Sequence, residues 1–410
     1  MHTPVIVPGK SKHFIDFENK YNAHNYESIP VVITKGKGVH VWDVDGKRYY
    51  DFLSAYSAVN QGHCHPKIIE TLIEQSQKLT LTSRAFYNNV LGEYAEFITK
   101  YFGYDKVLPM NTGVEAVETA IKLCRKWAYE VKGIETNKAK IIVCADNFHG
   151  RTTGIISFST DPSAKNNYGP FTTGFKIIPF NDLEALAEAL VDKNVAGFLV
   201  EPIQGEAGVI VPDDGYLEKA KQYCTDANVL FIADEIQTGL CRTGKMLCCD
   251  HENVRPDILI LGKALSGGTL PVSAVLADDE IMLTIKPGEH GSTYGGNPLA
   301  CSIAITALKV LREEKMAENS ELLGNIFRQE LKNIQSPYIS VIRGKGLFNA
   351  IEITHPDKEA AWKLCIELKE NGLLAKPTHG DKIRFAPPLI ITKEQLLEGI
   401  EAIEKSLLIL

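Results

Sequence analysis

Lys263 is the residue best placed for covalent chemistry in this sequence. It follows the apolar run Asp257–Leu261 and opens a turn rich in glycine and serine. We expect its ammonium group to lie at the mouth of a sheet, where loss of solvation lowers the pKa of a lysine from about 10.4 and makes the amine nucleophilic. The structural alternative is a lysine that extends from a strand end into solvent.

A carboxylate at the end of a second apolar run gives Lys263 a functional companion. Asp234 directly follows the run Val229–Ala233, and a carboxylate there can keep a pyridine nitrogen protonated. A pyridoxal phosphate enzyme needs both groups, the carboxylate at the ring nitrogen and the lysine as Schiff-base partner. An aspartate at a strand end also commonly caps a helix, but the presence of the pair favours the cofactor.

The segment Asn111–Lys122 has the features of a helix whose first turn binds an anion. Thr112 suits the N-cap position, and Gly113 allows backbone amides to approach a phosphate. Thr112 and Glu115 also match a capping box, which needs no ligand, so the spacing leaves both interpretations open. Phe148, at another strand end, could stack on a flat ring or pack in the core.

These residues follow apolar runs that alternate with segments of helical periodicity. Continuous apolar runs predict strands buried on both faces, hence a largely parallel sheet covered by helices. Ligands bind beyond the carboxyl ends of such strands, where this sequence places its polar residues. The predicted strands are Lys140–Cys144, Phe175–Pro179, Ala196–Val200, Val229–Ala233, Asp257–Leu261 and Pro271–Leu276.

Smaller modules are predicted at both ends of the chain. Short alternating runs within Val31–Leu53 predict an antiparallel meander. A long helix is expected from Leu299 to about Glu314, and a final helix begins with a capping box at Thr392. The strands expected between these helices are Ile339–Ile342 and Leu347–Ile353.

Composition narrows the classes of protein. With 410 residues the chain has room for two to four domains at about 100–200 residues each. It has 44 basic and 51 acidic residues and a net charge of −7, which argues against nucleic acid as the main partner. The nine cysteines lack paired spacing, and no uncharged apolar run reaches the roughly 18–20 residues that span a bilayer. Without a secretory or transit pattern, we expect a soluble cytoplasmic protein that does not bind membranes.

Other catalytic motifs are absent from the sequence. It contains no Walker A, G-x-S-x-G, H-E-x-x-H or C-x-x-C string. His63-Cys64-His65 offers metal-ligand types, but no second cluster lies at metal-binding spacing. We therefore expect no metal site.

At these residues the chain resembles the class III, fold-type-I aminotransferases that use pyridoxal phosphate, and most closely their ornithine aminotransferase branch. The resemblance runs from about Ala23 to the C-terminus. It implies an α/β fold with a large domain over residues 56–300, in which helices flank a mostly parallel seven-stranded sheet. Residues 1–55 and 301–410 would form a small α+β domain. The strings that carry the resemblance are Tyr56-Ser-Ala-Val-Asn-Gln-Gly-His-Cys-His-Pro66, Met110-Asn-Thr-Gly-Val-Glu-Ala116, Glu201-Pro-Ile-Gln-Gly-Glu-Ala-Gly208, Phe231-Ile-Ala-Asp-Glu-Ile-Gln-Thr-Gly239, Leu261-Gly-Lys-Ala-Leu-Ser-Gly-Gly268 and Gly291-Ser-Thr-Tyr-Gly-Gly-Asn-Pro298.

The resemblance implies a cofactor site for pyridoxal 5′-phosphate. Lys263 would be the Schiff-base lysine, and Asp234 would pair with the ring nitrogen. Gln237 would approach the phenolic oxygen, and Phe148 would stack on the ring. Thr293 would reach the phosphate of a neighbouring subunit, so a homodimer or a higher homo-oligomer with shared active sites is expected. The expected cofactor-binding residues are Thr112, Gly113, Val114, Phe148, His149, Asp234, Gln237, Lys263, Ser292 and Thr293.

The resemblance also implies how substrates bind. Tyr26 and Arg151 would hold the α-carboxylate and α-amino group of ornithine, and Tyr56 would narrow the site in favour of that orientation. Arg384 would bind the α-carboxylate of glutamate or 2-oxoglutarate, and Glu206 would pair with it when ornithine is bound. The expected substrate-binding residues are Tyr26, Tyr56, Arg151, Glu201, Glu206 and Arg384.

The implied reaction transfers the δ-amino group of ornithine to 2-oxoglutarate. Its products would be glutamate and glutamate 5-semialdehyde, which cyclises to pyrroline-5-carboxylate. A related aminotransferase acting on acetylornithine, 4-aminobutyrate or lysine is the alternative, with Tyr26 and Tyr56 as the discriminating residues. A mutase or decarboxylase on the same scaffold would need no oxo-acid acceptor. A binding protein without activity would be expected to lack Lys263 or Asp234.

Overall fold

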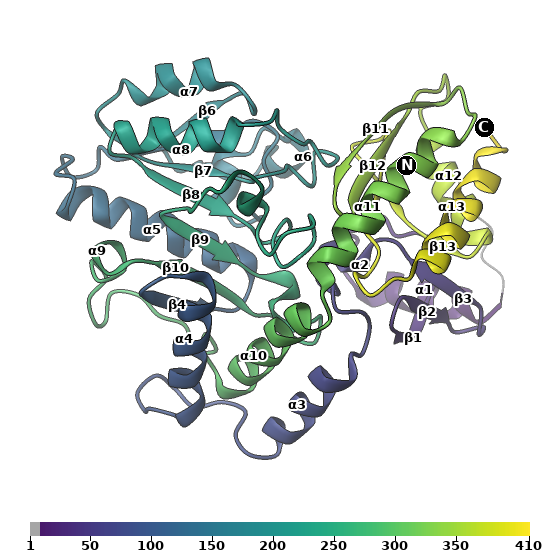
Figure 1. Cartoon of the computed structure of the whole chain (residues 1–410), viewed down its shortest axis with the longest axis horizontal. Helices are drawn as coiled ribbons and strands as arrows, with labels where there is room; N and C mark the ends of the chain where they lie inside the picture. Colours follow the sequence, from purple (N-terminus) through teal and green to yellow (C-terminus); the bar gives the residue numbers. More distant parts are fainter. Residues whose placement is uncertain (1–8) are drawn as a thin grey trace.

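The computed structural model describes residues 9–410, so the first eight residues of the predicted 1–55 segment lie outside the described part. Figure 1 shows two lobes, a larger one around a central sheet and a smaller one that contains both ends of the described chain. The α/β class and the assembly of the small lobe from both ends of the chain agree with the expectation from sequence.

A seven-stranded sheet forms the centre of the larger lobe, in the order β4-β10-β9-β8-β7-β5-β6. The five neighbouring strands β9, β8, β7, β5 and β6 are parallel, whereas β10 is antiparallel to both β9 and β4. The mostly parallel sheet is therefore confirmed. The strands are β4 (Lys106–Met110), β5 (Lys140–Cys144), β6 (Phe175–Ile178), β7 (Val195–Val200), β8 (Leu230–Asp234), β9 (Ile258–Leu261) and β10 (Ser273–Ala277).

Helices cover both faces of this sheet. Alternate residues of one strand pack into two different cores: Ile141 and Val143 lie with the buried side of α5, while Ile142 and Cys144 lie with α7 and α8. Figure 1 shows α8 in front of the sheet and α5 behind it. This two-sided burial explains why the strands are continuously apolar. The helices are α4 (Asn89–Phe102), α5 (Gly113–Glu130), α7 (Leu183–Leu190), α8 (Tyr216–Asp226) and α9 (Asp279–Met282).

The small lobe contains two four-stranded sheets, β1-β2-β3-β13 and β11-β12-β15-β14. The first is the predicted N-terminal meander, joined by one strand from near the C-terminus. The predicted capping box at Thr392 is present at the start of α13. The strands are β1 (Ile33–Lys37), β2 (His40–Asp43), β3 (Arg48–Asp51), β11 (Ile339–Lys345), β12 (Phe348–Ile353), β13 (Leu373–Leu374), β14 (Lys376–Thr378) and β15 (Lys382–Phe385); the helices are α1 (Gly9–Tyr21), α11 (Met316–Asn333), α12 (Ala360–Glu370) and α13 (Lys393–Leu407).

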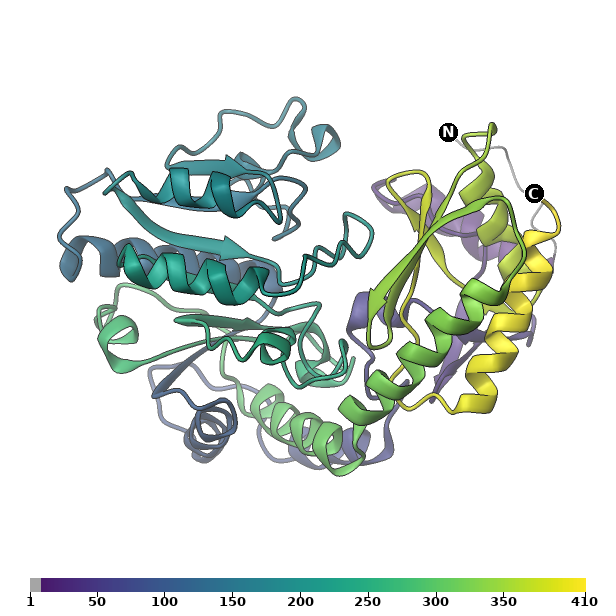
Figure 2. The same ribbon diagram turned by 45° about the horizontal axis from the view of Figure 1, so that its top comes forward.

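The helix α10 (Pro298–Glu313) packs against α3 (Pro66–Ser76) and α4 in the larger lobe. It then meets α11, and the two helices run in succession along the junction of the lobes (Figure 2). A domain boundary at residue 300 would separate α10 from its packing partners. We therefore propose that the boundary lies between α10 and α11.

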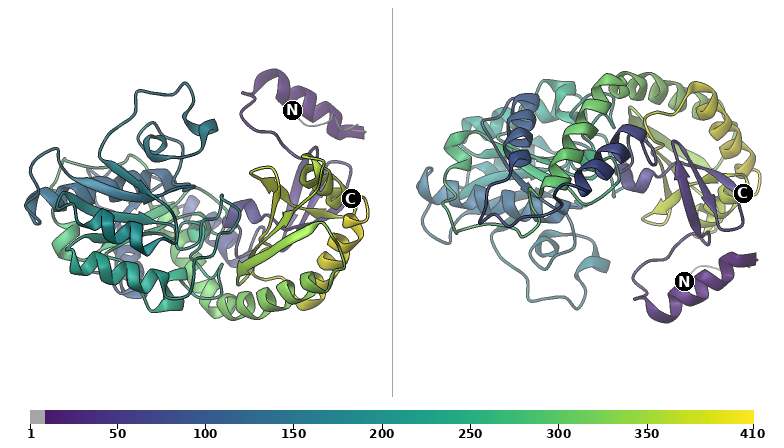
Figure 3. Two further views of the ribbon diagram at one scale, coloured as in Figure 1. Left: turned by 90° about the horizontal axis from the view of Figure 1, so that it is seen from above. Right: turned by 90° about the horizontal axis from the view of Figure 1, so that it is seen from below.

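The N-terminal helix α1 lies on the outside of the small lobe (Figure 3). It is held there by Asp45, which accepts hydrogen bonds from the Lys10 backbone N–H (3.3 Å) and the Ser11 hydroxyl (3.2 Å). Among residues 9–410 no helix is long and apolar enough to cross a membrane.

Candidate active site

Lys263 lies at the mouth of the central sheet, as its sequence position predicts. It begins a 3₁₀ turn (Lys263–Ser266) just after β9 and has a φ of 44°. Its side chain is half-buried and forms no hydrogen bond or ion pair with the residues that the structure describes. Burial lowers the pKa of its ammonium group, and the nearby carboxylates of Glu206 and Asp234 oppose that shift only in part. A lowered pKa favours the free amine, which is the nucleophilic form of a lysine.

One cavity joins Lys263 to the N-terminus of α5. The cavity has a volume of about 290 Å³, and Thr112, Gly113 and Lys263 are among the residues that line it. The capping box is present: Thr112 Oγ1 accepts from the Glu115 N–H (3.4 Å), and Glu115 Oε2 accepts from the Thr112 N–H (2.6 Å). It leaves the amides of Gly113 and Val114 without intrahelical partners, as at any helix start. The capping box and an anion site can therefore coexist.

Ser292 brings a second loop to this helix start. Its hydroxyl oxygen accepts hydrogen bonds from Asn111 Nδ2 (2.9 Å) and from the Gly295 N–H (2.9 Å). The next residue, Thr293, is exposed. The loop thus offers Thr293 to solvent beside the cavity rather than to the core.

Asp234 ends β8 and is buried. Its Oδ2 lies 2.6 Å from His149 Nδ1, and its Oδ1 accepts from the Ile236 N–H (3.1 Å). No helix begins at Asp234, so the helix-cap alternative does not apply. Burial alone would lower the pKa of His149, but the hydrogen bond and charge of Asp234 outweigh it and raise that pKa.

Glu201 lies behind this pair and is also buried. Its Oε1 accepts a hydrogen bond from the Phe148 N–H at 2.8 Å. Burial, reinforced by the charge of Asp234, raises the pKa of Glu201 to about 7. The site therefore holds a carboxyl group that titrates near neutral pH.

Replacing Glu201 with glutamine should stabilise the protein more at pH 8 than at pH 5. The pKa of Glu201 is higher in the folded chain than in the unfolded chain, so folding stability falls as the pH rises from the unfolded value through about 7. Glutamine removes that penalty. Thermal unfolding at both pH values checks this. Glu206→Gln is the control and should show the opposite trend, because Arg384 outweighs burial and lowers the pKa of Glu206; an equal gain for Glu201→Gln at both pH values contradicts the assignment.

Phe148 and Gln237, the two residues expected to contact the cofactor ring, lie next to Arg151 and Tyr56 respectively. Phe148 is 36% exposed, so it is not a core residue, and the Arg151 guanidinium carbon lies 5.6 Å from the centre of its ring. Gln237 is buried and donates from Nε2 to the Tyr56 carbonyl at 3.4 Å. A Cβ at Gly205 would lie 1.8 Å from Gln237 Oε1, so only glycine allows this close approach.

The structure brings Arg384 and Glu206 together from opposite lobes. Arg384, on β15, is 3% exposed, and its Nη1 and Nη2 bind the two carboxylate oxygens of Glu206 at 2.8 Å and 3.2 Å. Its guanidinium carbon also lies 5.0 Å from the centre of the Tyr56 ring. Such a bidentate pair neutralises the charge of the Arg384 guanidinium group.

Tyr26 and Arg151 meet in a second cavity, of about 390 Å³, which they line with Glu27, Thr153 and other residues. This cavity and the one at Lys263 share no lining residue. Tyr26 is 74% exposed.

Lys376 is a neighbour of Tyr26 that the sequence patterns do not single out; its ammonium nitrogen lies 5.9 Å from the centre of the Tyr26 ring. Lys376 is the strand partner of Arg384 in register. Only this strand pairing places Lys376 near the site, and short apolar patterns in the sequence do not reveal which strands pair.

The chain matches the family described as aminotransferase class-III over residues 21–407. The chain belongs to the class III aminotransferase family. It is 63% identical over 401 residues to the ornithine aminotransferase of Rattus norvegicus, covering 98% of this chain and 91% of the rat protein.

Two solved structures of class III aminotransferases are similar over nearly the whole chain. An ornithine aminotransferase from Toxoplasma gondii, with partial occupancy of PLP at its active site, is 52% identical with a TM-score of 0.96 and coverage of 98% of this chain and 94% of that one. An acetylornithine aminotransferase from Elizabethkingia anophelis is 58% identical, with a TM-score of 0.90 and coverage of 98% of this chain and 100% of that one. The chain therefore has the fold of the PLP-dependent aminotransferases.

The expectation of a cytoplasmic protein is wrong, because the rat relative is named as a mitochondrial enzyme. The nine cysteines are all free and eight of them are buried, which fits any reducing aqueous compartment. Charge and cysteine state therefore do not separate the cytosol from the interior of an organelle.

Proposed function

We propose that this chain is a pyridoxal phosphate-dependent ornithine δ-aminotransferase with 2-oxoglutarate as amino acceptor. The observation that carries the proposal is the bidentate pair of Glu206 and Arg384 beside Tyr56, close enough to Lys263 for the charges of both residues to act on its ammonium group. A neutralised Arg384 disfavours binding of an amino acid by the carboxylate next to the reacting amine. The high identity to the rat ornithine aminotransferase supports the same substrate.

The residues present fit the cofactor. The cavity at Lys263 includes the start of α5, which offers unpaired amides to a phosphate, and the Asp234 carboxylate lies at the end of a neighbouring strand. His149 Nε2 is buried without a hydrogen-bond partner in the described part of the chain. When bound, pyridoxal phosphate supplies an electron sink for the carbon that carries the amine. Asp234 would keep the ring nitrogen protonated, and the contact of His149 with Asp234 Oδ2 would fix the orientation of that carboxylate.

Substrate orientation follows from three side chains. Arg151 binds the α-carboxylate of ornithine, and Tyr26 contacts the same end of the substrate in the cavity that they share. The δ-amine then points toward Lys263. Lys263 would act as the base that takes a proton from Cδ of ornithine and as the acid that delivers that proton to the cofactor, and its lowered pKa favours the base form.

The second half of the reaction uses Arg384. The α-carboxylate of 2-oxoglutarate displaces Glu206 and takes its place on the guanidinium group. Amino transfer then gives glutamate, while the glutamate 5-semialdehyde from the first half cyclises to pyrroline-5-carboxylate. Alternating substrates at one site predict ping-pong kinetics.

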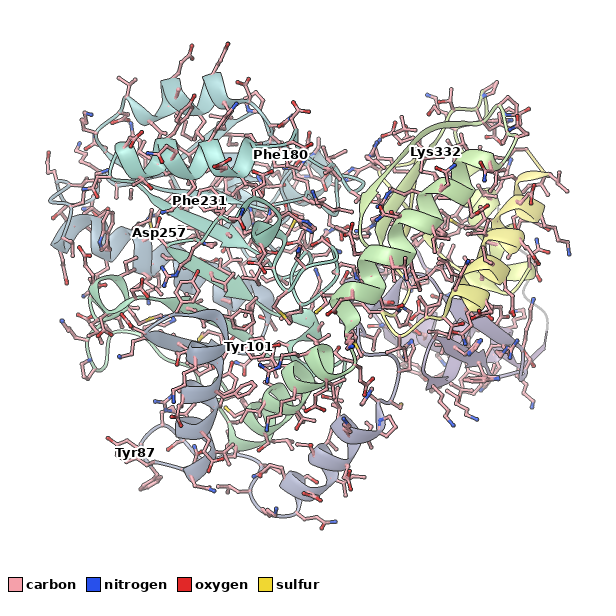
Figure 4. All side chains as sticks on the ribbon, viewed as in Figure 1. Tyr87, Tyr101, Phe180, Phe231, Asp257 and Lys332 are labelled. Atoms are coloured by element: carbon pink, nitrogen blue, oxygen red, sulfur yellow. The ribbon has the colours of Figure 1, made fainter. Side chains whose placement is uncertain are left out.

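A homodimer is the proposed active unit. Thr293 is exposed beside the cavity, and the adjacent Tyr294 is 57% exposed. Phe86 and Tyr87 are also exposed, and Figure 4 shows Tyr87 reaching outward from the edge of the larger lobe. Such an exposed aromatic surface fits a second copy of the chain.

A panel of amino donors tests the substrate. Purified protein loaded with cofactor is supplied with 2-oxoglutarate and either ornithine, N-acetylornithine, 4-aminobutyrate or lysine, and glutamate formation is followed. We expect the highest kcat/KM with ornithine. A higher value with N-acetylornithine would favour the alternative that the similar Elizabethkingia structure represents, and turnover without an acceptor would favour a mutase or decarboxylase.

Glu206→Ala should increase reaction with glutamate relative to ornithine by about 10-fold, because Arg384 becomes free to bind an α-carboxylate. The measurement is the ratio of kcat/KM for the two donors. Glu352→Ala is the matched control: Glu352 pairs with Arg343 at 2.7 Å and is 24% exposed, against 25% for Glu206. An unchanged ratio in Glu206→Ala would refute the masking role.

A further inference from the structure

A left-handed turn carries Tyr56 into the site. Four successive residues other than glycine, Ser54 to Ser57, have φ values of 48°, 46°, 59° and 72°. L-amino acids disfavour this conformation, and runs of it persist only where surrounding contacts hold them. Tyr56, at 59°, is the residue whose ring faces Arg384. The direction of that ring therefore depends on whatever holds the turn.

Asp51 holds the start of the turn. It is 8% exposed, and its Oδ1 accepts hydrogen bonds from the backbone N–H groups of Leu53 and Ser54, both at 2.9 Å. Its Oδ2 lies 2.7 Å from His63 Nε2, which fixes the orientation of the carboxylate. One side chain thus fixes the two amides that lead the chain into the left-handed region.

The turn's own polar side chains do not hold it. The hydroxyl groups of Ser54 and Ser57 are buried and have no hydrogen-bond partner within residues 9–410. After the turn, Gln237 donates to the Tyr56 carbonyl at 3.4 Å, and Ala58 lines the cavity of Lys263. The turn therefore joins the cofactor side of the site to the substrate side, and the Asp51 carboxylate anchors its first two amides.

We propose that Asp51 is a positioning residue that sets the preference for the δ-amine by holding Tyr56 in the left-handed turn against Arg384. The inference rests on the proposed function in one respect, the role of Tyr56 in orienting the substrate. It adds a residue that touches neither substrate nor cofactor, and it explains how a run of four disfavoured conformations is retained.

The first test is the donor selectivity of Asp51→Ala. Its ratio of kcat/KM for ornithine to that for glutamate should fall by about 10- to 100-fold, because a small displacement of an orienting group has effects of that size. Asp51→Asn keeps an oxygen for the two amides and should retain most of the wild-type ratio. If Asp51→Ala does not fold, His63→Ala replaces it and should lower the ratio in the same direction.

Asp43→Ala is the matched control. Asp43 ends the adjacent strand and is 7% exposed; its Oδ1 accepts from the Asp45 and Lys47 N–H groups (3.0 and 2.8 Å) and its Oδ2 from the Tyr49 hydroxyl (2.7 Å). It should lose thermal stability as Asp51→Ala does, with no change in selectivity. An equal change in selectivity for both variants, or none for Asp51→Ala, would overturn the proposal.

A crystal structure of the cofactor-loaded Asp51→Ala protein separates this inference from the proposed function. Residues 54–57 should leave the left-handed region, and the Tyr56 ring should move away from Arg384. Retention of all four positive φ values would overturn the role of Asp51 whatever the enzyme acts on. If the wild-type protein does not turn over ornithine, the proposed function is overturned. The crystal structure of the variant then still tests whether Asp51 holds the turn.

Discussion

Replacing Lys263 with alanine is expected to remove nearly all turnover, by roughly 10³-fold or more, since one side chain serves as both the covalent partner of the cofactor and the proton carrier. The same variant should lose the pH-independent yellow absorbance of the loaded protein, because alanine cannot form the Schiff base. Both effects have one origin in the structure: Lys263 lies at the cavity shared with the start of α5, with a pKa lowered by burial. Steady-state rates and absorbance spectra check them.

Lys132→Met is a suitable control for Lys263→Ala. Burial also lowers the pKa of Lys132, but this lysine donates to the carbonyl groups of Val195 (2.7 Å) and Ala227 (3.4 Å) away from the cavity. It should keep both the absorbance and the turnover of the folded protein. A Lys263→Ala protein with full activity would show that another amine carries the chemistry.

Arg384→Ala is expected to impair the half-reaction with 2-oxoglutarate by roughly 2–5 kcal/mol, because a buried guanidinium group that pairs with a substrate carboxylate is lost. The ornithine half-reaction should suffer less, since there Arg384 is paired with Glu206 and does not bind the substrate. Single-turnover rates, measured separately with ornithine and with 2-oxoglutarate, give both numbers. An equal loss in the two halves would contradict the assigned role.

Removing Arg384 alone leaves Glu206 buried without its partner, which could disturb the site. The double variant Arg384→Ala with Glu206→Ala tests for this. It should recover part of the ornithine half-reaction and none of the 2-oxoglutarate half-reaction. Recovery of both halves would mean that the single variant acted through an unpaired Glu206.

Local patterns in the sequence predicted the elements that carry the site. Continuous apolar runs identified six strands of the central sheet, and the capping boxes at Thr112 and Thr392 are both formed. These features depend on residues close together in sequence. The juxtaposition of Glu206 with Arg384, which lie 178 positions apart, came from the family resemblance, because composition and spacing carry no information about such contacts.

Other features needed the folded chain. The edge strand β4 contains Pro109 and was not among the predicted strands, and the antiparallel direction of β10 depends on how the loop before it runs. The left-handed turn at Ser54–Ser57 contains no glycine, so the sequence gives no indication of positive φ values there. The hydrogen bonds of Asp51 and the surrounding packing hold this turn in the folded chain. The packing of α10 on α3 and α4 is likewise a tertiary contact, which shifts the proposed domain boundary beyond residue 300.

The central claim is that the amine transferred from ornithine is the one at Cδ. The most direct measurement supplies the loaded enzyme and 2-oxoglutarate with ornithine labelled with ¹⁵N at either the α or the δ nitrogen, and then determines the label in the glutamate formed. We predict that the label reaches glutamate from the δ position and remains in pyrroline-5-carboxylate from the α position. Label reaching glutamate from the α nitrogen would contradict the orientation assigned to Arg151, Tyr26 and the Glu206–Arg384 pair.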